Sequence, residues 1–172
     1  MALALALTLA VLQAAPVRAD EAVAQELADC QDEAKPAEQR IKICTALIGT
    51  PGIDKALKAE ALLNRGMARQ DADDAAAAII DYTEAITLNP EYPALYVQRA
   101  DAYAETEDFA LAIEDMTRAI ALEADDADHF ATRGELHAET GDLALAEADY
   151  RKALELEANH AQALAGLKEL KK

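Results

Sequence analysis

The sequence predicts an all-α solenoid, an array of helical hairpins that stack side by side. The first observation is a pattern of seven positions that recurs three times, 34 residues apart and without insertions. A fixed period of this length is the signature of a repeat array. The second is composition, because 52% of the residues are apolar, many of them alanine, while aromatics make up 4%. Such a composition favours helices throughout. The last copy of the pattern consists of Arg133, Gly134, Ala146, Asp149, Tyr150, Ala153 and Leu156.

The chain is strongly acidic, with a formal net charge of −17 over 172 residues. Lysines and arginines form no basic stripe that would bind phosphates. An acidic surface repels nucleic acid, whose affinity for proteins depends on cationic side chains. We therefore expect no nucleic-acid partner.

Residues 1–19 resemble a secretory signal peptide. An apolar run is followed by small residues at alternate positions, Val17 and Ala19, which indicates cleavage after Ala19. The run is too short to span a bilayer comfortably, so we expect no membrane span after cleavage. The alternative is an ordinary apolar helix of the fold. Cleavage predicts a periplasmic or secreted protein.

Residues 20–52 are expected to form a helical hairpin, with helices over 20–34 and 36–48. It contains Cys30 and Cys44, and an even, small cysteine count in an exported chain suggests a disulfide. This bond would close a loop of about 15 residues, for which chain entropy gives about 3 kcal/mol. Two separate buried thiols are the alternative. The spacing fits neither a CxxC redox motif nor a zinc site.

Residues 53–172 hold the repeat domain, separated from the hairpin by Gly49-Thr50-Pro51-Gly52. Gly141 suits a helix C-terminus, and Asp142 suits the N-cap that follows it. The expected units are three repeats and a cap, at about residues 59–92, 93–126, 127–160 and 161–172. Within them we expect helices over about 54–70, 74–88, 93–105, 108–122, 127–140, 142–156 and 160–171.

The recurring residues have a packing explanation. Gly66, Ala100 and Gly134 are small because the partner helix of each hairpin must pass closely. Two helices cannot bury both of their faces, so each repeat needs its neighbours. The recurring arginines are expected to pair with the recurring aspartates, and solvated arginines without a fixed partner are the alternative. These arginines are Arg65, Arg99 and Arg133, and the aspartates are Asp81, Asp115 and Asp149.

The pattern resembles the tetratricopeptide repeat family, which has a small residue in the first helix, then Ala, an aromatic and Ala in the second, then Pro. Met116 replaces the aromatic in the second repeat, and no first helix contains Trp. The leader and the cysteine hairpin also resemble small periplasmic members from proteobacteria. The first repeat carries the whole pattern, as Gly66, Ala78, Tyr82, Ala85 and Pro90.

The resemblance implies a right-handed superhelix that binds a protein or peptide in a concave groove lined by the first helices. Family members that clamp a peptide carboxylate use Lys, Arg and Asn there, and here Asn64 alone is of that type. The acidic groove instead favours an extended segment carrying Lys or Arg. A solvated helix face is the alternative. The groove residues are expected to be Glu60, Leu63, Asn64, Met67, Asp71, Val97, Gln98, Asp101, Glu105, Asp128, Thr132, Glu135 and Glu139.

We expect no enzymatic activity, no cofactor and no metal. His129, His137 and His160 are isolated, without the partner spacing of a metal site or a catalytic triad. His137 is expected to be a packing residue. The function indicated is a non-catalytic binding scaffold in the cell envelope. The alternative is a structural subunit that self-associates or serves as an accessory subunit of an envelope complex.

Overall fold

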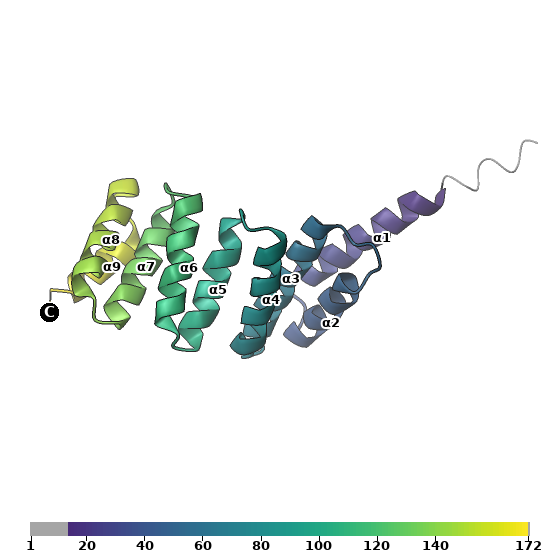
Figure 1. The fold of residues 1–172 in the computed structure, drawn as a ribbon, viewed down its shortest axis with the longest axis horizontal. Coiled ribbons are helices and arrows are strands. Elements are labelled where there is room, and N and C mark those ends of the chain that lie inside the picture. The colour runs from purple at the N-terminus through teal and green to yellow at the C-terminus, as the bar shows by residue number, and fades with distance from the viewer. Residues whose placement is uncertain (1–13, 172) are drawn as a thin grey trace, which may run out of the picture.

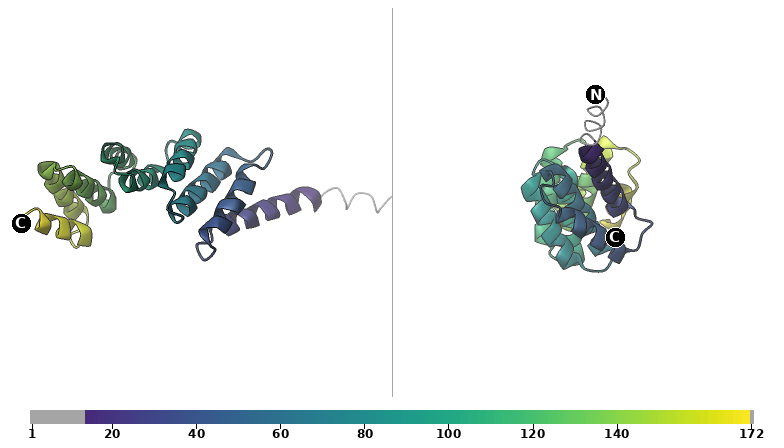
Figure 2. Two further views of the ribbon diagram at one scale, coloured as in Figure 1. Left: turned by 90° about the horizontal axis from the view of Figure 1, so that it is seen from below. Right: turned by 90° about the vertical axis from the view of Figure 1, so that its right-hand side faces the viewer.

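A computed structural model describes residues 14–171, which form nine α-helices and no strand. The helices stack as antiparallel pairs along one axis, from α1 at one end to α9 at the other (Figure 1). Seen along that axis, the pairs superpose into a compact cross-section (Figure 2). The predicted all-α solenoid is confirmed. Its helices are α1 (Ala14–Gln31), α2 (Ala37–Ile48), α3 (Lys55–Gln70), α4 (Ala75–Leu88), α5 (Pro93–Glu105), α6 (Phe109–Leu122), α7 (Ala127–Glu139), α8 (Leu143–Leu156) and α9 (Ala161–Glu169).

The first helix differs from its predicted bounds of 20–34. It begins at Ala14 and ends at Gln31, because the Asp32 carboxylate accepts a hydrogen bond from the backbone N–H of Ala34 (3.1 Å). Such a local bond competes with the helical backbone pattern. Pro36 then disfavours helical geometry at the residue before it.

Part of the predicted signal peptide, residues 1–13, lies outside the described residues. In the uncleaved chain α1 runs without a break through Ala19, after which we expect cleavage. Among the described helices, none combines the length and the apolarity that crossing a bilayer requires.

The N-terminal hairpin packs as an additional unit of the stack. Cys30 and Cys44 form the predicted disulfide between α1 and α2, with their Cα atoms 5.1 Å apart and both side chains fully buried. The hairpin is also tied to the first repeat, because Arg65 donates a hydrogen bond to the Thr45 hydroxyl (3.1 Å). The same bond recurs along the stack, from Arg99 to Thr83 at 3.0 Å and from Arg133 to Thr117 at 3.1 Å.

The turns inside the three repeats also follow the 34-residue period. Asp73, Glu107 and Gly141 occupy equivalent positions, and all have positive φ, at 59°, 63° and 82°. Glycine adopts this conformation without the steric cost that a Cβ adds. The prediction that Gly141 ends α7 is therefore borne out, and the two earlier turns adopt the same shape with a charged residue.

Each repeat closes by packing a small residue against a large one. A Cβ built on Gly134 would lie 2.9 Å from the Tyr150 ring, and one on Gly66 would lie 2.4 Å from the Tyr82 ring. The tyrosines are buried, so the rings have little room to retreat. In the second repeat, the equivalent residues are Ala100 and the flexible Met116, which belong to one core cluster.

The recurring arginines and aspartates pair as predicted, within each repeat. Arg99 donates two hydrogen bonds to Asp115, both of 2.7 Å, from Nε and from one terminal nitrogen. The two other repeats contain the same bidentate pair, Arg65 with Asp81 and Arg133 with Asp149, at 2.7–2.9 Å. The carboxylates are buried, so these pairs link the two helices of a repeat in the low-dielectric interior.

Candidate functional site

The predicted groove residues all lie on the first helices of the repeats or just beyond them, on α3, α5 and α7, and none is buried. Seven of them line two hollows near the N-terminal end of the stack, and two more, Asp128 and Glu135, contact His160 and Gln162 at the C-terminal end. The remaining four, Val97, Asp101, Thr132 and Glu139, lie on α5 and α7 outside these groups. The sequence did not show this division.

The first hollow, of about 460 Å³, lies between α3 and α5 and is also lined by the turn after α1. Four predicted residues line it, together with Gln70 and Glu33. Three of its six lining residues are carboxylates and none is a cation. The predicted four are Met67, Asp71, Gln98 and Glu105.

The second hollow, of about 420 Å³, lies where α1, α3 and the α4–α5 turn meet. It contains the predicted residues Glu60, Leu63 and Asn64, and sequence analysis missed its remaining walls. Gln31 of α1 donates a 2.7 Å hydrogen bond to Glu60, so the N-terminal hairpin closes this end of the groove. The missed walls include Gln31, Asn89 and Tyr92.

The predicted residues of the third repeat lie next to α9. Asp128 contacts the His160 ring nitrogen Nε2 at 2.8 Å, and Glu135 accepts a 2.5 Å hydrogen bond from Gln162. Two acids on α7 are therefore already bonded to the N-terminal end of α9. Gln70 and Glu105 form a similar 2.8 Å bond between α3 and α5. Amide–carboxylate bonds of this kind thus join α1 to α3, α3 to α5 and α7 to α9.

Two acids of the predicted groove, Asp71 of the first hollow and Asp101 of α5, differ in how their charge is compensated. Asp71 forms an ion pair with the buried Arg40 of α2, a partner that sequence analysis missed. Asp101, one turn before Glu105 on α5, makes no hydrogen bond or ion pair with another described residue. Burial, together with the nearby Glu105 charge, raises the pKa of Asp101 to about 6. The groove thus holds an uncompensated carboxylate.

This raised pKa predicts a pH-dependent effect of Asp101→Asn on stability. A carboxyl group whose pKa rises from 3.8 to about 6 on folding destabilises the folded state above pH 6 and leaves it unaffected below pH 4. The variant is therefore expected to be more stable than the parent by about 1–2 kcal/mol at pH 8 and equal to it at pH 4. Urea unfolding at several pH values measures the difference. Glu114→Gln, at an exposed position on α6, is the control and should show no such trend. An equal effect of Asp101→Asn at every pH would contradict the assignment.

The three histidines occupy different surroundings. His137 is half-buried, with Nε2 3.9 Å from the Asp149 carboxylate, which agrees with the predicted packing role. His160 is the N-cap of α9, and its Nδ1 accepts from the backbone N–H of Ala163 (3.3 Å). His129, which appears isolated in the sequence, lies near two carboxylates, Glu123 and Asp126.

Comparison with known proteins identifies the repeat. A family model described as "Tetratricopeptide repeat" matches residues 59–92, 93–126 and 130–160. The chain belongs to the tetratricopeptide repeat family. The three matches coincide with the hairpins α3–α4, α5–α6 and α7–α8, so the family assignment and the observed packing agree. The tetratricopeptide repeat is typically a non-catalytic scaffold for binding peptides and proteins. No curated protein sequence matches the chain.

Solved tetratricopeptide repeat structures resemble this protein over most of its length. The tetratricopeptide repeat domain of Arabidopsis OM64 is 29% identical, with a TM-score of 0.66, over 69% of this chain and 98% of that domain. The second such domain of human RPAP3, solved with the HSP70 peptide SGPTIEEVD, is 29% identical with a TM-score of 0.66, over 69% of this chain and 99% of the other. A tetratricopeptide repeat protein from Parabacteroides merdae shares the fold over 90% of this chain and 59% of its own length, with a TM-score of 0.77 at 20% identity.

Proposed function

We propose that this tetratricopeptide repeat protein is a non-catalytic scaffold of the cell envelope, and that its concave groove docks an extended segment carrying Lys or Arg. The observation that carries the proposal is the first hollow, which is lined by three carboxylates, two amides and a methionine. Asp101 adds a carboxylate that has no cationic partner among the described residues. A cationic side chain placed there would lower the electrostatic cost that raises the pKa of Asp101.

The acidic groove is poorly suited to the peptides with which two related domains have been solved. Domains of RPAP3 have been solved with the chaperone peptides SRMEEVD and SGPTIEEVD, both of which end in acidic residues. Neither hollow of the present groove is lined by a Lys or Arg that would bind such a tail. Like charges across an interface oppose binding. These features support a basic segment over an acidic one.

The location in the periplasm or outside the cell belongs to the same proposal. It is supported by the signal-like residues 1–19 and by the Cys30–Cys44 disulfide, because disulfides persist in oxidising compartments. Fractionation of cells expressing the tagged full chain, with N-terminal sequencing of the mature protein, tests it. A cytosolic protein retaining residue 1 would refute this part.

The binding proposal predicts preference for basic peptides. Three peptides of equal length, differing only in Lys, Gln or Glu at alternate positions, are titrated against the full chain by calorimetry at low and high salt. The Lys peptide should bind best and lose affinity with salt. Asp101→Asn/Glu105→Gln should weaken it about tenfold, because two ion pairs are each expected to contribute about 0.7 kcal/mol.

A matched variant separates groove contacts from net charge. Glu114→Gln/Glu155→Gln removes two charges from exposed positions on the second helices α6 and α8, and it should leave binding of the Lys peptide nearly unchanged. Preferential binding of the Glu peptide would overturn the proposal. So would equal weakening by both double variants, since that would reflect the total charge alone.

A second function is favoured by exposed apolar side chains on the second helices. Leu111, Leu143 and Leu145 are 43%, 52% and 52% exposed on α6 and α8. Such side chains favour the alternative of a structural subunit that self-associates. Analytical ultracentrifugation at dilute concentration distinguishes the two, because a stable oligomer that Leu111→Gln/Leu145→Gln disrupts would support the structural subunit.

A further inference from the structure

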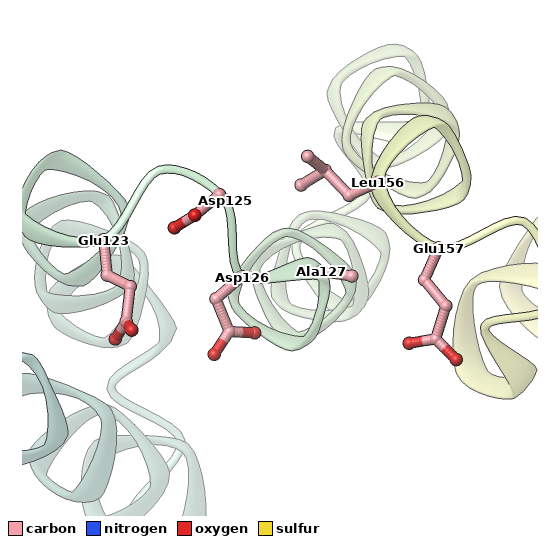
Figure 3. A pocket seen from close by; sticks show the side chains of 6 residues that line it. All are labelled: Glu123, Asp125, Asp126, Ala127, Leu156 and Glu157. Carbon is pink, nitrogen blue, oxygen red and sulfur yellow. The ribbon is translucent and has the colours of Figure 1, made fainter.

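Three potential metal ligands meet at the junction between the second and third repeats. Glu123 is the C-cap of α6, Asp126 is the N-cap of α7, and His129 lies in the first turn of α7. One ligand atom from each lies within 4.8 Å of the other two. Glu123 and Asp126 extend to the same side of the α6–α7 loop (Figure 3).

The histidine is buried and has no hydrogen-bond partner among residues 14–171. His129 is 7% exposed, its Nδ1 is unpaired, and its Nε2 lies 3.8 Å from Asp126 Oδ2, too far for a hydrogen bond. Asp126 uses its other oxygen, Oδ1, to cap α7 by accepting from the backbone N–H of Asp128 (2.8 Å). Asp126 Oδ2 and His129 Nε2 therefore lie near each other without forming a hydrogen bond. The described residues thus give neither ring nitrogen of this buried imidazole a hydrogen-bond partner, and a cation bound at Nε2 between the ring and the carboxylates would supply one.

Packing does not account for these residue types. One repeat earlier the equivalent positions hold Asn89, Tyr92 and Leu95, and one repeat later they hold Glu157, His160 and Ala163. Leu95 and Ala163 are 1% and 0% exposed, so the position of His129 is an apolar core position in the neighbouring units. The combination of two carboxylates with a buried imidazole occurs only at the α6–α7 junction of the three compared.

We propose that Glu123, Asp126 and His129 bind one divalent transition-metal ion of the Zn²⁺ type. An imidazole with two carboxylates suits zinc and its neighbours better than Ca²⁺ or Mg²⁺, which prefer all-oxygen sites. Zinc bonds of about 2.0–2.2 Å require ligand atoms about 3.4 Å apart, so the present cluster must contract. Glu123 is exposed and ends a helix, and its side chain can make that movement. Water completes the coordination.

The ion would join the end of α6 to the start of α7 and so clamp two repeats together. An ion that binds the folded chain and not the unfolded chain raises the free energy of unfolding, and the increase grows with the logarithm of the ion concentration. The role of this site is therefore structural, and it is separate from the groove.

The test uses the full chain freed of metal by a chelator and titrated with Zn²⁺ alone, with Ca²⁺ and Mg²⁺ as comparison ions. We expect one Zn²⁺ per chain by calorimetry and a rise in the thermal midpoint. Glu123→Gln should lower the affinity for Zn²⁺ at least about tenfold. Because Glu123 is exposed, this variant should fold normally. Glu157→Gln is the matched control, because it makes the same change at the equivalent exposed position one repeat later.

A second pair of variants tests the imidazole. His129→Gln should abolish the saturable Zn²⁺ site, whereas His137→Gln, on the same helix, should retain it. Loss of affinity with Glu123→Gln alone still supports the site if His129→Gln fails to fold. The proposal is overturned if no saturable Zn²⁺ site is found, if Ca²⁺ competes equally, or if Glu157→Gln weakens Zn²⁺ as much as Glu123→Gln does.

Discussion

Replacing Asp115 with alanine is expected to lower the free energy of unfolding by about 3–5 kcal/mol. Asp115 is 4% exposed and accepts two hydrogen bonds from Arg99. The same hydrogen bonds raise the pKa of the Arg99 guanidinium, which stays charged at all accessible pH values. Without the carboxylate, a largely buried cation would have no counter-charge. Urea unfolding followed by circular dichroism measures the loss.

The matched experiment removes both charges. Arg99→Met/Asp115→Leu should recover most of the lost stability, because apolar side chains of similar volume can replace a buried ion pair. Glu147→Ala removes the exposed ion pair with Arg151 (2.6 Å) and should cost only about 0.5 kcal/mol. If Asp115→Ala cost no more than Glu147→Ala, the buried pair would have no special role in the fold.

Replacing Gly134 with leucine is expected to cost about 3 kcal/mol or more through overpacking. Even a Cβ there would lie 2.9 Å from two atoms of the Tyr150 ring and 3.3 Å from the backbone oxygen of Ala146. Tyr150 also faces Gly166, where an added Cβ would lie 2.3 Å from the ring, so the ring is confined on two sides. Gly134→Ala should cost less, because alanine is favoured over glycine in a helix by about 1 kcal/mol and this gain offsets part of the clash.

The second repeat supplies a control for this contact. It carries Ala100 and Met116 where the third repeat carries Gly134 and Tyr150. Gly134→Ala/Tyr150→Met recreates that pair, so the double variant should lose less free energy of unfolding than the two single variants lose together. Thermal and urea unfolding of the parent, the two single variants and the double variant would show this. Additive losses would mean that the clash at Gly134 does not involve the tyrosine ring.

Much of the architecture follows from the spacing of residues along the chain. The 34-residue period places each small residue opposite a large one in every repeat, and the arginine of each pair stands 16 residues before its aspartate. Both relations are local, within one helical hairpin. The predicted helices, the disulfide and the three buried ion pairs were therefore accessible from sequence.

Contacts between units could not be derived in this way. The pairing of Asp71 with Arg40 and of Glu60 with Gln31 depends on how the N-terminal hairpin, which lies outside the repeat pattern, packs on α3. The groove prediction did not show which acids are already bonded. Whether these residues bind a ligand stays a prediction.

The sequence by itself determined the helical period, the small-to-large packing and the arginine–aspartate pairs, because these depend on residues within one hairpin. Tertiary structure alone decided that Asp101 is partly buried without a counter-charge and that the side chains of His129, Glu123 and Asp126 converge. The surroundings of Asp101 depend on the angle between neighbouring helices, and those of His129 on the path of a loop. Spacing alone fixes neither, although Glu123, Asp126 and His129 lie within seven residues of one another.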